Sequence, residues 1–221
     1  MVSTLQGTGP FTVLAPTNEA MQAFLESNDY TDISEVPTDI LQQVLLNHVI
    51  VGEVSSASLS SIGAGYTETS STAAPDGNNL SIYFNATDGV VFNGMATVTD
   101  ADITATNGII HKVNAVIGIP DITTFVTADP NLSRLEQGLT SHTFDFVTTL
   151  QGSGPFSILA PNNAAFDALL STNDDWTEPG DIPEATLATA LSLHVLPNVN
   201  VREADLVDGE VATLELSLIH I

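Results

Sequence analysis

The chain has 221 residues, of which 43% are hydrophobic, and it contains no cysteine. Three basic residues stand against 27 acidic ones, a formal net charge of −24 at pH 7. This balance argues against nucleic-acid binding and against docking on anionic membranes, because no basic patch can form. Disulfides and thiolate metal sites are excluded, and the sequence has no run of 18 apolar residues that could insert into a membrane.

The first predicted structural unit is a strand followed by a helix, and the chain contains it twice. Residues 2–24 and 147–169 align without a gap, and 14 of the 23 aligned positions are identical. Repetition at a spacing of 145 residues is typical of two tandem copies of one domain. We therefore predict one domain over residues 1–119 and a second over residues 120–221.

Within the first copy, a turn rich in glycine and proline at residues 7–10 precedes the apolar run Phe11–Ala15, which predicts a buried strand. Pro16 ends this strand, and Thr17 or Asn18 can cap the helix that follows. The buried positions predicted for that helix are Met21, Phe24 and Leu25.

A second helix is predicted to begin near Pro37, with apolar residues three and four positions apart along one face. That face consists of Leu41, Val44, Leu45, His48 and Val49. The second repeat reproduces it with Leu187, Ala190, Leu191, His194 and Val195. The two histidines are therefore expected in the domain cores.

From Ser55 onward the first repeat changes to short apolar runs separated by turn residues, which predicts an antiparallel β half after the helical half. The runs are Leu80–Phe84, Val90–Phe92, Ala96–Val98 and Ile109–Ile117. In the last run, alternation places His111 on the inward face of the strand.

Three motifs in this order resemble the fasciclin domain family. Residues 9–20, GPFTVLAPTNEA, are similar to the family's first conserved box, Asn47-His48 to its short central motif, and residues 107–113, NGIIHKV, to its second box. The resemblance implies two tandem fasciclin-like α+β domains, each a helical half packed on a β-sandwich or wedge.

The same resemblance implies an extracellular or cell-surface module for adhesion. Its expected partners are proteins or glycans of the extracellular matrix or of neighbouring cells, and no catalysis and no cofactor are expected. The alternative from another class is a secreted or periplasmic carrier that holds a small apolar ligand or a lipid in a pocket between the two halves.

Comparison of the two copies predicts that both repeats are cut short. The first lacks about 25 residues of an opening helical segment, and the second lacks about 36 residues of its β half. Residues 217–221 superficially resemble the second box but come too early in the repeat, so we expect that they are not native. A signal or an anchor is expected outside this sequence.

The five histidines match no metalloprotease, Walker or dinucleotide pattern. We interpret His48, His111 and His194 as structural core imidazoles, each hydrogen-bonded to the backbone or to a residue such as Asn47. A hydrolase with an unrecognised Ser/His/Asp site stays an alternative, although no G-x-S-x-G motif supports it.

Three short clusters carry the residue types that bind calcium, at residues 76–78, 100–102 and 173–175. None of them matches the twelve-residue calcium loop with its final Glu. Because Asp and Asn are the usual turn residues, we interpret the clusters as turns, with weak calcium binding as the alternative.

Asp39 and Ile40 lie in the predicted first turn of the helix that carries His48. Animal members of the family present an Asp-Ile pair near this position as an integrin-binding element, which makes this pair a candidate adhesion site. The second repeat departs from it with Ala185-Thr186-Leu187. The simpler interpretation is that the Asp39 carboxylate suits the positive end of the helix dipole.

Overall fold

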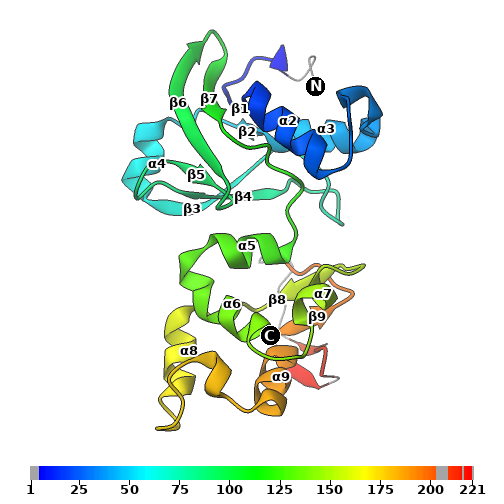
Figure 1. Ribbon diagram of the computed structural model, residues 1–221, viewed down its shortest axis with the longest axis vertical. Helices are drawn as coiled ribbons and strands as arrows, with labels where there is room; N and C mark the ends of the chain where they lie inside the picture. The colour runs from blue at the N-terminus through cyan, green and yellow to red at the C-terminus, as the bar shows by residue number, and fades with distance from the viewer. Residues whose placement is uncertain (1–4, 203–208, 216, 221) are drawn as a thin grey trace. The chain divides into compact units, whose positions relative to one another are not determined.

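The computed structural model describes residues 5–202, 209–215 and 217–220. The chain divides into two compact units, Met1–Pro120 (unit 1) and Asp121–Ile221 (unit 2), as Figure 1 shows. Each unit contains one copy of the repeated strand and helix. Within the described residues, no helix combines the length and the apolar character that crossing a membrane requires.

The helical half of unit 1 follows the sequence pattern closely. Its elements are β1 (Phe11–Pro16), α2 (Asn18–Ser27), the 3-10 helix η1 (Ile33–Glu35), α3 (Thr38–Asn47) and β2 (Val49–Val51). The predicted cap is confirmed, because the Thr17 side chain accepts a hydrogen bond from the backbone N–H of Ala20 at 3.2 Å. Such a cap stabilises a helix by about 1 kcal/mol.

The β half of unit 1 begins after a short helix. Its elements are α4 (Ser56–Ile62), β3 (Ala64–Glu68), β4 (Ser81–Asn85), β5 (Val91–Phe92), β6 (Ala96–Ala105) and β7 (Gly108–Val113). The four predicted runs correspond to β4 to β7, although β6 is longer than expected and β7 ends four residues earlier. Helices α2 and α3 contact β1 and β2, whereas α4 contacts β3 (Figure 1).

The seven strands in the described part of unit 1 form one sheet, in the order β2-β1-β7-β6-β5-β4-β3. Neighbouring strands are antiparallel except β1 and β7, which are parallel from the pair Phe11↔Gly108 to the pair Pro16↔Val113. This parallel pair joins the helical half to the β half. The fold class is α+β, as predicted.

The core of unit 1 has two parts. The larger one lies on the sheet and includes Leu14, Ile50, Phe92, Val113 and Ile117, each with none of its surface exposed. The smaller one lies between α2 and α3, where Val116 packs with residues of both helices. The segment that follows β7 therefore supplies side chains to both parts.

Unit 2 is mainly helical in its described residues. Its helices are α5 (Ile122–Ala128), η2 (Pro130–Leu132), α6 (Ser133–Thr140), α7 (Phe146–Leu150), α8 (Asn163–Leu170), η3 (Pro179–Asp181) and α9 (Glu184–Leu193). Its strands are β8 (Phe156–Ile158), β9 (Val195–Pro197), β10 (Glu210–Ala212) and β11 (Leu218–His220). Within this described part, β8 pairs with β9 and β10 pairs with β11.

Residues 217–221, which we predicted not to be native, contain the whole of β11. This strand pairs antiparallel with β10 through Ile219 and Val211, and Ile221 lies outside the described residues. The origin of residues 217–221 stays a prediction.

The close approach of β1 and β7 generates a stability prediction. A Cβ atom on Gly108 would lie 1.9 Å from the carbonyl oxygen of Phe11, so Gly108→Ala must push the two strands apart. We expect it to lower the free energy of unfolding of unit 1 by about 3 kcal/mol, measured by urea titration.

Gly89→Ala is the matched control, because Gly89 also has a positive φ of 79° but a Cβ there would meet nothing within 4 Å. The Gly89→Ala variant should lose only about 1–2 kcal/mol of unfolding free energy, from the backbone strain of a side chain at positive φ. Equal losses for the two variants would contradict the importance of the β1–β7 contact.

Candidate functional site

His48 ends helix α3 and is 3% exposed. Its Nδ1–H donates to the carbonyl oxygen of Val44 at 2.7 Å, and its Nε2 accepts from the backbone N–H of Ile117 at 2.9 Å. The neighbouring Asn47 side chain donates to the carbonyl oxygen of Gly118 at 2.8 Å and accepts from the Thr69 hydroxyl at 3.1 Å. Together the two residues hold the segment after β7 against α3.

Burial lowers the pKa of His48 below its ordinary value of 6.5, because the charged imidazolium loses its hydration inside the protein. The hydrogen bond to the Val44 carbonyl acts in the opposite direction but is the smaller effect. His48 is therefore a neutral imidazole whose two nitrogens have opposite hydrogen-bonding roles.

His111, on β7, is 1% exposed. Its Nδ1 accepts from the backbone N–H of Asp102 at 3.1 Å, and its Nε2–H donates to the carbonyl oxygen of Val54 at 2.9 Å. In both imidazole rings of unit 1, each of the two nitrogens is therefore hydrogen-bonded to a backbone group. In this arrangement neither ring has a nitrogen left to bind a metal or to transfer a proton.

The three acidic clusters lie on turns and surface strands. In the first and third clusters, Asp76 accepts from the N–H of Asn78 at 3.0 Å and Asn173 accepts from the N–H of Asp175 at 2.9 Å. Among the described residues, no group of three or more His, Asp or Glu side chains is arranged to hold a metal ion.

In the cluster at residues 100–102, the two carboxylates have separate partners. The Asp100 carboxylate contacts Lys112 Nζ at 3.0 Å. The Asp102 carboxylate accepts from the hydroxyl and the N–H of Ser56, which lowers the pKa of Asp102. The cluster thus links β6 to β7 and to the start of α4.

The Asp-Ile pair lies in the first turn of α3, where both side chains are exposed, Ile40 by 46%. It borders a surface depression of about 500 Å³ in unit 1. The depression is lined by Asp39, Ile40, Gln42, Gln43, Ala73 and Ile119. Ile119, which is 40% exposed, comes from the end of the unit, 79 residues away from Ile40 in the sequence.

Gln43 gives this depression a fixed wall. Its side-chain oxygen accepts from the hydroxyl of Ser71 at 2.8 Å and from the N–H of Thr72 at 3.2 Å. The loop that contains Ala73 is therefore attached to α3. Sequence reasoning missed the other four lining residues, and the only signal for them was the bulky apolar residue just before Pro120.

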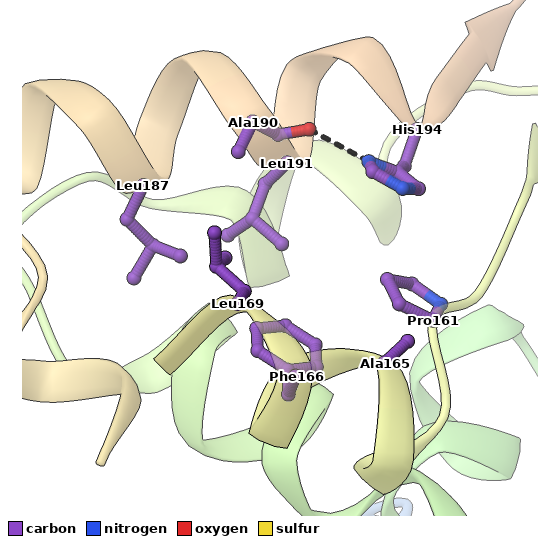
Figure 2. Close-up of a pocket in the computed structure, with 8 residues that line it drawn as sticks. All are labelled: Pro161, Ala165, Phe166, Leu169, Leu187, Ala190, Leu191 and His194. Atoms are coloured by element: carbon purple, nitrogen blue, oxygen red, sulfur yellow. Dashed lines mark hydrogen bonds between the residues drawn. The ribbon is translucent and has the colours of Figure 1, made fainter. Parts of the chain in front are cut away.

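Unit 2 contains a groove of about 290 Å³ between α8 and α9. Its lining, drawn in Figure 2, consists of Pro161, Ala165, Phe166, Leu169, Leu187, Ala190, Leu191 and His194. His194 Nδ1–H donates to the carbonyl oxygen of Ala190 at 2.7 Å, as His48 does to Val44. We expected His194 in the core, but the structure places it half-buried in the wall of this groove.

The family of this chain is shown by its match to a family of known proteins. The sequence matches the family described as "Fasciclin domain" over residues 1–120 and 130–221, which is nearly the whole chain. The chain belongs to the fasciclin domain family. This agrees with the three motifs from which the resemblance was inferred.

Relatives of the fasciclin chain occur in bacteria and in animals. Protein sll1483 of a Synechocystis species is 34% identical over 117 residues, which is 53% of this chain and 59% of that protein. The pig transforming growth factor-beta-induced protein ig-h3 is 27% identical over 213 residues, 96% of this chain and 29% of that protein. The chain thus spans less than two thirds of these two relatives.

A solved structure shares the fold. A FAS1 domain pair from the insect cell adhesion molecule fasciclin I has a TM-score of 0.56 and 18% sequence identity, and the match covers 99% of this chain and 77% of that one. This similarity supports the predicted fold of tandem fasciclin domains.

The His111 contacts predict a stability effect. His111→Leu leaves the N–H of Asp102 and the carbonyl of Val54 without their buried partner, and we expect unit 1 to lose about 2–4 kcal/mol. His111→Gln keeps a donor and an acceptor and should lose less. Urea unfolding followed by tyrosine fluorescence tests this, because all three tyrosines (Tyr30, Tyr66 and Tyr83) lie in unit 1. An unchanged midpoint for His111→Leu would contradict a structural role.

His48 predicts a pH dependence. Because its folded pKa lies below 6.5, its contribution to stability is complete above that pH and is lost as the pH falls toward the folded pKa. Between pH 8 and pH 5 the stability of unit 1 should therefore fall more steeply in the wild type than in His48→Gln, by at most about 1.4 kcal/mol per pH unit. Parallel profiles at constant ionic strength would refute this effect.

Proposed function

We propose that this fasciclin pair is an extracellular or cell-surface adhesion module that binds a protein or glycan partner without catalysis. The observation that carries the proposal is the depression beside α3, where Ile40 and Ile119 are exposed next to the Asp39 carboxylate. Exposed apolar side chains gathered in one concave place are typical of interaction sites. The insect relative with the same fold is by its name a cell adhesion molecule, which supports this proposal.

The chemistry of the depression fits a partner that inserts an apolar group and approaches with positive charge. Ile40 and Ile119 supply apolar contact area, and Asp39 can accept a charge-assisted hydrogen bond from a lysine or an arginine. A net charge of −24 repels polyanionic glycans at long range and favours basic protein surfaces or uncharged glycans.

The absence of catalysis is part of the proposal, and the two buried histidines of unit 1 support it. His48 and His111 use both ring nitrogens on backbone groups, so neither can act as a general base without breaking a buried contact. The hydrolase alternative needs a base that these two residues do not provide.

The adhesion proposal predicts the behaviour of one pair of matched variants. Ile40→Ser removes apolar contact area from the depression and should weaken binding of the selected partner about tenfold. Ile62→Ser is the control, because Ile62 is 64% exposed on α4 and does not line the depression. The measurement is a matrix-protein and glycan array, followed by titration of the partner that binds.

The same array, run with calcium and with a chelator, tests the acidic clusters. Binding that disappears in chelator would make these clusters calcium ligands in addition to turns. Equal binding by Ile40→Ser and the wild type would contradict the proposed surface, whatever the partner.

A carrier of a small apolar ligand is the second candidate, and the groove of unit 2 is the observation that favours it. Its volume of about 290 Å³ lies just below the usual range for ligand pockets, which begins at about 300 Å³. The groove lies between two helices rather than between the helical and β halves, where the carrier hypothesis placed it. Native mass spectrometry of the purified protein would reveal a ligand that co-purifies.

A further inference from the structure

The amide group of Gln43, in the wall of the depression beside α3, has a fixed orientation. Its oxygen, Oε1, accepts from the Ser71 hydroxyl at 2.8 Å and from the backbone N–H of Thr72 at 3.2 Å. A backbone N–H can only donate, so the amide atom that faces Thr72 has to be the oxygen. The nitrogen of the same amide therefore points away from the loop.

This nitrogen, Nε2, is a donor without a partner in the protein. It carries two N–H groups, and neither has a hydrogen-bond acceptor among the described residues. Nε2 is not among the buried side-chain atoms that lack a partner, so solvent reaches it. A few oriented polar groups in an otherwise apolar hollow are what gives a binding site its specificity.

The second polar group of the depression is the Asp39 carboxylate. It is exposed and has no hydrogen-bond or ion-pair partner in the part of the chain that the structure describes. Unit 1 contains 12 acidic residues and one basic residue, Lys112, which contacts Asp100 at 3.0 Å. The field around the depression is therefore negative, which attracts cationic groups and repels anionic ones.

The remaining lining of the depression is partly apolar. Ile40 is 46% exposed and Ile119 is 40% exposed, and Ala73 lies between them in the lining. The volume of about 500 Å³ lies within the range of about 300–1,000 Å³ that is usual for ligand sites. One place thus offers apolar contact area, a carboxylate and an oriented amide donor.

This face of α3 is not where an opening helical segment packs. Unit 2 contains such a segment, and its helix α6 contacts α8 and η3. The three positions of α9 that correspond to Asp39, Ile40 and Gln43 are exposed although this segment is present. They are Ala185, Thr186 and Thr189. The depression is therefore a surface of the domain itself, and the α9 face has neither the carboxylate nor the amide.

We propose that the depression beside α3 binds an extended basic peptide segment of a partner protein, and that Gln43 is a specificity-determining residue for it. This inference rests on the proposed adhesion function and names the class of partner. A lysine or arginine of the segment contacts Asp39, and a neighbouring backbone carbonyl accepts from Gln43 Nε2. An apolar side chain of the segment packs on Ile40 and Ile119.

Two other classes of partner fit the depression less well. A polyanionic glycan is repelled by unit 1 and has no cation for Asp39. An uncharged glycan can hydrogen-bond to Gln43 and Asp39, but it gains nothing from the negative field and places hydroxyl groups against the aliphatic Ile40 and Ile119. A basic peptide uses all three features of the lining.

The experiment uses the full chain and a labelled synthetic peptide of three Leu-Lys pairs, followed by fluorescence anisotropy. Saturable binding that weakens as salt is added is expected. Gln43→Glu keeps an oxygen for Ser71 and Thr72 but removes the donor, so it should weaken binding about tenfold. Gln42→Glu is the matched control, because Gln42 also lines the depression and the substitution adds the same charge. It should bind at least as tightly as the wild type.

A second matched pair separates the site from general attraction to an acidic protein. Asp39→Asn should weaken peptide binding about tenfold. Glu68→Gln removes the same charge from an exposed position on β3 outside the depression and should bind like the wild type. Spermine, a cation without a carbonyl group, should bind Gln43→Glu at least as tightly as the wild type.

Two measurements show that the variants keep their structure. Tyrosine fluorescence reports on the folding of unit 1, which contains all three tyrosines. Hydrogen exchange of the Thr72 amide should be as slow in Gln43→Glu as in the wild type and faster in Gln43→Ala, because only the alanine variant lacks the acceptor.

Three results would overturn the proposal. One is equal peptide binding by folded Gln43→Glu and Gln42→Glu, and another is equal binding by Asp39→Asn and Glu68→Gln. The third is an uncharged glycan that binds in place of the peptide and depends on Ile40, which would refute the peptide while the adhesion surface stands. Array binding that Ile40→Ser leaves unchanged would instead refute the adhesion proposal, whatever the peptide does.

Discussion

Unit 1 depends on one buried polar contact, which joins the end of helix α3 to the segment after β7. Asn47 and His48 fix the backbone of Ile117 and Gly118, residues about 70 positions away in the sequence. Buried polar groups are costly unless they are paired, so this contact specifies a single position for the segment. With that position fixed, Val116 enters the gap between α2 and α3, and Ile117 enters the core on the sheet.

The same contact explains why equal sequences have different environments in the two units. Both copies contain Leu-Ala-Pro, which ends β1 in unit 1 and follows β8 in unit 2, and both histidines donate to the carbonyl of the preceding turn. In unit 1 the segment after β7 and β7 itself cover these groups. In the described part of unit 2 no strand occupies the corresponding edge of β8, and Leu159 and His194 are correspondingly more exposed. Exposure here is set by a distant element rather than by the local sequence.

This limits what the sequence could predict. Local signals were sufficient for β1, α2 and α3, because turn residues, the Thr17 cap and apolar spacing act within a few positions. The parallel pairing of β1 with β7 was missed, since alternation along a strand carries no information about its neighbour in a sheet. The sequence analysis identified only part of the lining of the depression beside α3. Asp39 and Ile40 stood out as a motif, whereas Ile119 enters the site only through the fold that the buried contact fixes.

The two candidate surfaces are therefore consequences of one structural constraint. The segment that the contact holds in unit 1 ends at Ile119, so fixing Gly118 also places the side chain that completes the depression. In unit 2 the corresponding groove between α8 and α9 is lined by apolar side chains, and His194 Nε2 has no hydrogen-bond partner among the described residues. In unit 1 the segment after β7 fills the gap between α2 and α3, and its fixed position also completes the rigid depression beside α3. In the described part of unit 2 the corresponding gap between α8 and α9 is a groove, so the same histidine and the same pair of helices have two different environments.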